Sequence, residues 1–178
     1  MTNLPPNNPD DIPDQLGRIR LLALDVDGVL TDGSFIWGPG DVEMKRFCFH
    51  DIMGLSRARK AGLILALVSG EASPLIDRLA GKMQITDVFK GCKDKARAVA
   101  DLIERYHLSR DEICFMGDDI NDVGAMQAAG MGAAPPGAHP SALAAANWIT
   151  DRGGGDGAVR ELIDAILDAR EKKRRNLI

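Results

Sequence analysis

The chain alternates short apolar runs with longer segments in which apolar residues recur every three or four positions. Short apolar runs are typical of buried strands, and the longer spacing is typical of helices that bury one face. The apolar runs predict strands at 21–26, 63–69, 85–90 and 112–118, and a shorter one at 131–135. Helical spacing predicts helices at 50–62, 73–83, 93–107 and 120–130. This alternation predicts an α/β fold with a doubly wound, Rossmann-like parallel sheet.

Two segments do not follow the alternation. Residues 33–51 read as two short strands around Gly38-Pro39-Gly40, which predicts a small β-hairpin inserted after the first strand. Residues 1–17 are polar and rich in Pro and Asn, without the apolar stretch of a secretory signal, so we expect a disordered leader. The remaining sequence predicts a single domain over 18–171 and a basic tail at 172–178.

The composition narrows the choice of partners. The chain has 178 residues, of which 45% are hydrophobic, and a formal net charge of -4, which argues against binding to nucleic acid or to an anionic membrane surface. No apolar run approaches the length of a membrane span. The basic residues near the C-terminus fit the end of a helix, where cations are favoured. Cys48, Cys92 and Cys114 are odd in number and lack metal-binding spacing, so we expect reduced thiols and a cytoplasmic protein.

Polar residues follow several of the predicted strands. Asp25 and Asp27 end the first strand, Ser69 and Gly70 end the second, and Asp118 ends the fourth. Ligands of open parallel sheets bind at the carboxyl edge of the strands, where these residues would meet. An Asp-x-Asp pair alone also occurs in turns and helix caps, and a lone lysine such as Lys95 is often a solvated helix residue. The joint pattern is what indicates a site.

The residue types fit phosphate ester chemistry. A phosphate ester is anionic, so a carboxylate can attack it only if a cation screens the repulsion, and Mg²⁺ prefers the oxygen ligands that are present here. Asp25 is the candidate nucleophile, which would form an aspartyl-phosphate. Asp27 is the candidate proton carrier for the leaving group and then for the hydrolytic water.

The order of these motifs over residues 20–165 resembles the haloacid dehalogenase superfamily of phosphotransferases. The resemblance implies a haloacid dehalogenase fold in which Mg²⁺ is held by the Asp25 side chain, the Asp27 backbone carbonyl and Asp118. It also implies that the phosphoryl group is bound by Ser69, Gly70 and Lys95. Asp119 and Asp122 would orient the metal water and Lys95 from a second layer.

The spacing of the motifs leaves no room for a cap domain. The stretches LDVDGVLTDG, KRFCFHDIMGL, GDDINDVGAM and GGGDGAVREL then resemble the capless phosphatases of 2-keto-3-deoxy sugar acids. This resemblance implies a phosphorylated sugar-acid substrate, for which 3-deoxy-D-manno-octulosonate 8-phosphate is the first choice. It also implies a homotetramer assembled by the hairpins, with active sites at subunit interfaces.

The resemblance further implies substrate contacts from Lys45, His50, Asp51 and Arg152. Two interpretations remain open for the glycine run at 153–157: a functional segment, or a flexible linker before a helix capped by Asp156. Arg160 fits a solvated helix face better than a substrate contact. Glu71 departs from the arginine usual in octulosonate phosphatases, and with Lys82 it resembles the phosphatases of nine-carbon keto-deoxy or sialic acid 9-phosphates.

Other classes share parts of the pattern. A signalling receiver domain has an acidic cluster and a lysine around Mg²⁺, but it has no use for a second carboxylate two residues after the acceptor, and Asp27 argues against it. A phosphomutase needs a cap to exclude water. A non-catalytic tetramerisation module derived from a phosphatase stays as the alternative of another class.

Overall fold

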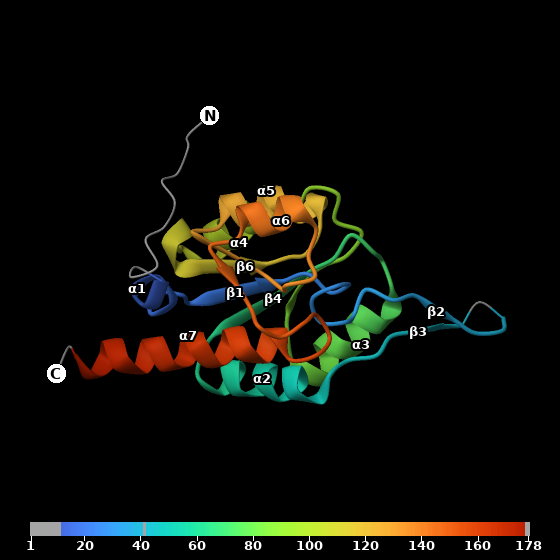
Figure 1. Ribbon diagram of the computed structural model, residues 1–178, viewed down its shortest axis with the longest axis horizontal. Coiled ribbons are helices and arrows are strands. Elements are labelled where there is room, and N and C mark those ends of the chain that lie inside the picture. Colours follow the sequence, from blue (N-terminus) through green and yellow to red (C-terminus); the bar gives the residue numbers. More distant parts are fainter. Residues whose placement is uncertain (1–11, 41, 177–178) are drawn as a thin grey trace.

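The computed structural model describes residues 12–40 and 42–176 (Figure 1). Positions 1–11 of the expected leader and 177–178 of the expected tail lie outside the described residues. The strands are β1 (Leu21–Leu24), β2 (Ile36–Trp37), β3 (Glu43–Met44), β4 (Ile64–Val68), β5 (Asp87–Phe89), β6 (Ile113–Met116), β7 (Met131–Ala134) and β8 (Trp148–Ile149). The α-helices are α1 (Ile12–Leu16), α2 (Phe49–Lys60), α3 (Pro74–Met83), α4 (Lys95–Tyr106), α5 (Val123–Ala128), α6 (Pro140–Ala145) and α7 (Ala158–Arg175). Short 3₁₀ turns are η2 (Arg110–Glu112) and η3 (Ile120–Asp122).

A six-stranded sheet forms the centre of the fold, in the order β5-β4-β1-β6-β7-β8. All of its neighbouring strands are parallel. Leu24 at the end of β1 lies beside Leu67 of β4 and Met116 of β6, so these three strands end at nearly the same level. After β1 the chain builds β4 and β5 on one side and then β6 to β8 on the other. The strand order therefore reverses between β1 and β6, where open α/β sheets form their ligand crevice.

Helices cover both faces of the sheet, because side chains of a strand point alternately to its two faces. Leu22 and Leu24 of β1 pack in the core with α2, α3 and α7, and Leu21 and Ala23 pack in the core with α4, α5 and α6. Figure 1 shows these two helical layers on opposite sides of the sheet. The prediction of a doubly wound α/β fold is confirmed.

The insertion after β1 is small, as the sequence predicts. Strands β2 and β3 pair antiparallel, and the N–H of Gly38 donates to the carbonyl of Val42 across the turn. Figure 1 shows this hairpin projecting from one end of the molecule. Only the hairpin and α2 separate β1 from β4 in the described chain, which confirms the absence of a cap. The hairpin exposes large apolar side chains, with Trp37 77% accessible.

The structure differs from the prediction at both ends and at one edge. Residues 12–16, inside the expected leader, form α1, which packs against α7 and buries Leu16. Helix α7 continues to Arg175, so its end lies beyond the expected domain boundary at 171, and the basic residues lie in the last turn of a helix, as expected from their charge. The edge strand β8 is not predicted, because two residues are too short to show a periodic pattern. None of the described helices is both long and apolar enough to cross a membrane.

Candidate active site

Asp25 is the first residue beyond β1 and lies at the strand reversal. Its N–H donates to the carbonyl of Met116 on β6 at 2.9 Å, which fixes the backbone between the two strands. The residue is only 5% exposed. Its Oδ1 accepts from the N–H of Val26 at 2.7 Å, and its Oδ2 lies 2.8 Å from Nζ of Lys95. The candidate nucleophile is thus held by a buried ion pair.

Lys95 begins α4 and is buried between two carboxylates. Its Nζ lies 2.6 Å from Oδ1 of Asp122 as well as near Asp25. The other oxygen of Asp122 accepts the N–H groups of Asp118 and Asp119 at 2.9 and 3.0 Å. Asp122 therefore orients both the lysine and the loop after β6, which is the positioning role that the sequence suggested for it.

Burial changes the titration of two of these carboxyl groups. Burial, followed by repulsion from Asp122, raises the pKa of Asp25 to about 8 despite the attraction of Lys95. Burial, followed by repulsion from Asp122 and Asp119, raises the pKa of Asp118 to about 7. Burial alone would lower the pKa of Lys95, but its two carboxylate neighbours outweigh this effect and raise it. The cluster thus has more carboxylates than its lysine neutralises, and an added cation would favour their ionised forms.

A divalent cation fits this cluster. Oxygens of Asp25, Asp118 and Asp122 lie within 4.8 Å of one another. Oδ1 of Asp118 is buried, with no hydrogen-bond partner among the described residues. Asp122 is fully buried and already binds Lys95 and the N–H groups of Asp118 and Asp119, so we assign the cation to the side chains of Asp25 and Asp118. The all-oxygen donor set suits Mg²⁺.

Two glycines give the acidic side chains their space. A Cβ on Gly28 would lie 2.0 Å from Oδ2 of Asp118, and Gly28 has a φ of +88°. A Cβ on Gly117 would lie 2.4 Å from the Cβ of Asp122. The sequence shows these glycines beside the aspartates, but only the fold shows which carboxylate each one accommodates.

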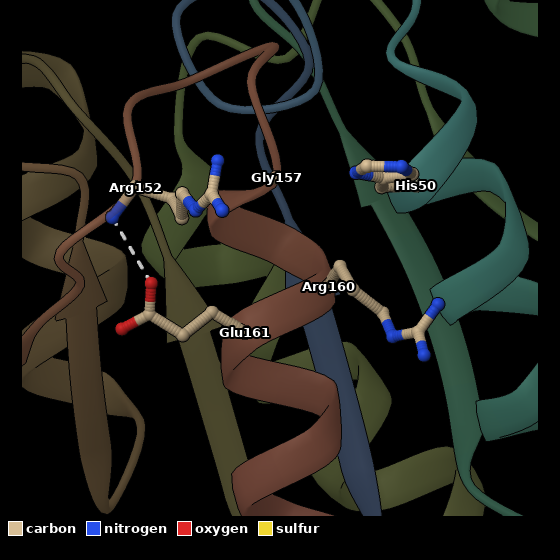
Figure 2. A pocket seen from close by; sticks show the side chains of 5 residues that line it. All are labelled: His50, Arg152, Gly157, Arg160 and Glu161. Atoms are coloured by element: carbon tan, nitrogen blue, oxygen red, sulfur yellow. Dashed lines mark hydrogen bonds between the residues drawn. The ribbon is translucent and has the colours of Figure 1, made fainter.

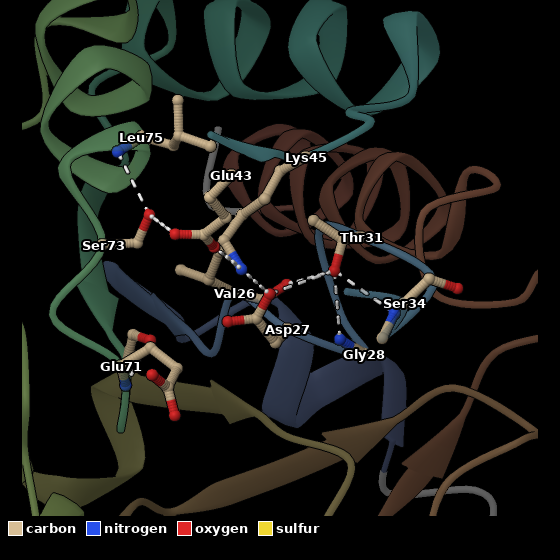
Figure 3. A network of polar contacts seen from close by, with 12 residues as sticks. Val26, Asp27, Gly28, Thr31, Ser34, Glu43, Lys45, Glu71, Ser73 and Leu75 are labelled. Carbon is tan, nitrogen blue, oxygen red and sulfur yellow. Dashed lines mark hydrogen bonds and ion pairs between the residues drawn. The ribbon is translucent and has the colours of Figure 1, made fainter. Parts of the chain in front are cut away.

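Asp27 lies in the same loop and has a different environment. Its Oδ1 lies 2.5 Å from Nζ of Lys45 and 3.5 Å from Oγ1 of Thr31, whereas its Oδ2 is buried with no partner in the described chain. Lys45 comes from the hairpin and also lies 3.1 Å from Glu43. Figure 3 shows Lys45 between Asp27 and Glu43, with Ser73 of the α3 cap beyond them. Glu43 and Ser73 are not among the site residues predicted from the sequence, and only the fold brings them to Lys45.

Ser69 and Gly70 follow β4, the neighbour of β1. The N–H of Ser69 donates to the carbonyl of Phe89 on β5, and its buried Oγ accepts the N–H of Glu71 at 3.1 Å. A Cβ on Gly70 would lie 3.6 Å from the amide nitrogen of Asn121, in the loop after β6. The predicted phosphate-binding residues therefore lie at the same sheet edge as the carboxylates.

The glycine run at 153–157 is part of the site's framework. The N–H of Gly155 donates to the carbonyl of Val29 at 3.0 Å. A Cβ on Gly154 would lie 1.8 Å from the carbonyl oxygen of Gly28, so only glycine allows this close approach. The run packs on the loop that carries Asp25 and Asp27, so the interpretation as a flexible linker is wrong.

Asp51 caps α7, whereas one of the two interpretations left open by the sequence placed Asp156 in that role. Asp51 is buried, and its two oxygens accept the N–H groups of Gly157 and Arg160 at 3.1 and 2.8 Å. Both oxygens are engaged in holding the N-terminus of α7, which gives Asp51 a capping role, and the substrate contact expected from the sequence stays a prediction. Asp51 and Gly157 are 106 positions apart in the sequence, so no local pattern reveals the cap.

The other expected substrate residues divide into two groups. His50 and Arg152 line a hollow of about 200 Å³ with Arg160 and Glu161, between the starts of α2 and α7 (Figure 2). Glu161 accepts the N–H of Arg152 and so fixes the start of this loop. Glu71 is exposed two residues after Ser69. Lys82 is in the last turn of α3, about 12 Å along the helix from its first residue, and the structure does not bring it to the cluster.

Comparisons with known proteins agree with this geometry. Residues 55–162 match the family model of haloacid dehalogenase-like hydrolases. The chain is 34% identical to the 3-deoxy-D-manno-octulosonate 8-phosphate phosphatase of Escherichia coli, over 91% of this chain and 86% of that protein.

Two solved structures are similar in fold over most of their length. One is the octulosonate 8-phosphate phosphatase of Moraxella catarrhalis in complex with magnesium, phosphate and KDO, with a TM-score of 0.89, 32% identity, and coverage of 96% of this chain and 98% of that one. The other is the cobalt-bound phosphatase of Haemophilus influenzae, with a TM-score of 0.85, 32% identity, and coverage of 89% and 92%.

Proposed function

The chain belongs to the haloacid dehalogenase-like hydrolases, and we propose that it is a Mg²⁺-dependent phosphatase of 3-deoxy-D-manno-octulosonate 8-phosphate. The observation that carries this proposal is the buried cluster of Asp25, Lys95 and Asp118 at the sheet reversal. The similarity to octulosonate phosphatases over nine tenths of the chain supports the choice of substrate.

The chain's own residues account for the two steps of the reaction. Oδ1 or Oδ2 of Asp25 attacks phosphorus, and the sugar alkoxide leaves as the aspartyl-phosphate forms. Asp27 gives its proton to that alkoxide, then takes a proton from the water that hydrolyses the aspartyl-phosphate. Lys95, with Ser69 and the loop at Gly70, stabilises the charge on the phosphoryl oxygens.

Asp25 and Asp118, with the backbone carbonyl of Asp27, would hold Mg²⁺. The cation supplies charge neutralisation between the carboxylate nucleophile and the anionic ester. Asp122 keeps Lys95 and the loop of Asp118 in place, and Asp119 extends the acidic surroundings of that loop. Burial of the cluster strengthens these interactions because less water screens them.

The proposal includes a homotetramer in the cytoplasm. The exposed hairpin side chains, with Phe35, Trp37 and Met44 each about half exposed or more, support self-association through the hairpins. His50 and Arg152 would contact the sugar acid at the mouth of the site. Three free cysteines support a reducing compartment. Light scattering tests the assembly, and a monomer at micromolar concentration contradicts it.

Turnover of the purified protein tests the activity. We expect phosphate release from 3-deoxy-D-manno-octulosonate 8-phosphate with Mg²⁺ and none with EDTA. Asp25→Asn should lower kcat at least a thousandfold, whereas persistence of activity in that variant would overturn the mechanism. Tetramer formation without any turnover of phosphate esters would favour the non-catalytic module.

A nine-carbon substrate is the second candidate because of Glu71. This residue follows Ser69 and Gly70, at the position where arginine is usual in octulosonate phosphatases. Parallel kinetics on a nine-carbon keto-deoxy or sialic acid 9-phosphate decide between the two. A tenfold preference in kcat/KM, equal to about 1.4 kcal/mol in transition-state binding, would assign the substrate.

A further inference from the structure

The geometry points to Lys45 of the hairpin as a positioning residue for Asp27, one that selects which carboxylate oxygen carries the proton. This inference rests on the proposed function, since it concerns the acid and base of that reaction. It assigns to Lys45 a role through Asp27 in place of the substrate contact expected from the sequence.

The contact between the two residues is close and shielded. Nζ of Lys45 lies 2.5 Å from Oδ1 of Asp27, and the lysine side chain is 1% exposed. A buried ammonium paired with a carboxylate has little freedom to move. Oγ1 of Thr31 lies 3.5 Å from the same oxygen and from the carbonyl oxygen of Val26, so its hydroxyl adds at most a weak contact to Oδ1.

The second oxygen of Asp27, Oδ2, remains available for proton transfer. Oδ2 is buried, and no described residue forms a hydrogen bond to it. Buried polar atoms without partners are rare, and they are found where a substrate, water or ion completes the site. Oδ1 remains an acceptor whether or not Oδ2 is protonated, so Lys45 can hold Asp27 in both states of the proton transfer.

Lys45 is itself held in place by Glu43 of the hairpin, which in turn is bound by the N-cap of α3. Glu43, two residues earlier on the same face of the hairpin, lies 3.1 Å from its Nζ. The other carboxylate oxygen of Glu43 accepts from Oγ of Ser73 at 2.9 Å, and Ser73 is the N-cap of α3. Figure 3 shows this line of contacts running from the α3 cap through the hairpin to Asp27. The core domain and the hairpin thus fix the lysine together.

Kinetics of Lys45→Met test the role, with Arg46→Gln as the matched control. Arg46 is the next residue, its side chain is 63% exposed, and it pairs with Asp32 outside the cluster. With the sugar-acid phosphate, we expect Lys45→Met to lower kcat/KM ten- to a hundredfold and Arg46→Gln to change it less than twofold. Lys45→Arg should restore part of the loss because guanidinium also binds a carboxylate.

A comparison of two leaving groups separates a role in proton transfer from a loss of fold, because unfolding would lower kcat/KM for both substrates equally. Nitrophenolate leaves without a proton, so Lys45→Met should change kcat/KM for p-nitrophenyl phosphate less than threefold. Equal losses on both substrates, or no loss on either, would overturn the inference. The urea midpoint of each variant records any loss of fold.

A double-mutant cycle separates positioning from substrate contact. If Lys45 acts through Asp27, adding Lys45→Met to Asp27→Asn should cause less than a twofold further loss in kcat/KM. Additive losses would assign Lys45 to the substrate and overturn the inference. If the wild type hydrolyses the aryl phosphate but not the octulosonate phosphate, the proposed substrate fails, and the cycle is run on the alkyl phosphate that the enzyme does hydrolyse.

Discussion

Nζ of Lys95 lies 2.8 Å from Oδ2 of Asp25, in an ion pair of which almost nothing is exposed. Asp25 directly follows strand β1 and Lys95 is the first residue of α4. Asp122 also pairs with the lysine. This pair couples the stability of the fold to the chemistry of the site, because neither charge is well solvated without the other.

Lys95→Met should therefore reduce both activity and stability. We expect kcat/KM to fall at least a hundredfold and the free energy of unfolding to fall by about 3 kcal/mol, since two buried carboxylates lose their partner. Enzyme assays and urea unfolding measure the two effects. Lys93→Met is the control: Lys93 is exposed two residues earlier, and a similar loss there would contradict the assignment.

Asp118→Asn should weaken Mg²⁺ binding more than it weakens the fold. Oδ1 of Asp118 is buried without a hydrogen-bond partner in the described part of the chain, and an amide is a poorer ligand than a carboxylate. Mg²⁺ that binds only the folded state raises the melting temperature, so a titration followed by melting gives the affinity. We expect at least a tenfold higher Mg²⁺ concentration for the half-maximal shift, and an unchanged titration would remove Asp118 from the site.

Gly28→Ala should disrupt the same carboxylate indirectly. The added Cβ would lie 2.0 Å from Oδ2 of Asp118 at a φ of +88°, so the side chain or the loop must move. We expect a tenfold or greater loss of Mg²⁺ affinity and a lower melting temperature. Gly81→Ala is the control, because no described residue lies within 4 Å of the Cβ that it would add and alanine favours the α3 helix.

The metal-free protein should lose stability as the pH rises. The folded pKa of Asp25 is raised to about 8 and that of Asp118 to about 7, both above the ordinary value of 3.8. Folding then favours the protonated forms, and this stability is lost as the pH rises from about 4 through 8. Melting in EDTA should show a lower midpoint at pH 8.5 than at pH 6.

Mg²⁺ should reverse that trend, because it binds the deprotonated carboxylates. The increase in melting temperature on adding Mg²⁺ should be larger at pH 8.5 than at pH 6. A shift of equal size at both pH values would show that proton release from these groups does not accompany binding.

Asp51→Ala should reduce stability without a specific effect on substrate binding. Its oxygens accept two N–H groups at the start of α7, so we expect a loss of about 1–2 kcal/mol with KM changed less than twofold. Asp156→Ala, at an exposed residue one position before Gly157, should cost less than about 0.5 kcal/mol. A large rise in KM in Asp51→Ala would support the substrate contact expected from the sequence.

The sequence by itself determined the alternation of strands and helices and the order of the acidic motifs, because periodicity and strand ends are local properties. It therefore placed Asp25, Ser69, Lys95 and Asp118 at one sheet edge. It also showed that there is no room for a cap between Asp27 and Ser69. The strand β8 and the helix α1 were not predicted, because a strand of two residues or a helix of five carries little periodic signal.

Only the tertiary structure decided how those residues are held. The pairing of Lys45 with Asp27 joins the hairpin to the catalytic loop, and the cap of α7 by Asp51 spans 106 residues. The approach of Gly154 to Gly28 likewise joins distant parts of the chain. Such contacts depend on how helices and loops pack on the sheet, and packing is set by the shapes of many side chains at once. For that reason the order of the residues indicated the type of chemistry, but it did not indicate which contacts hold the reacting residues in place.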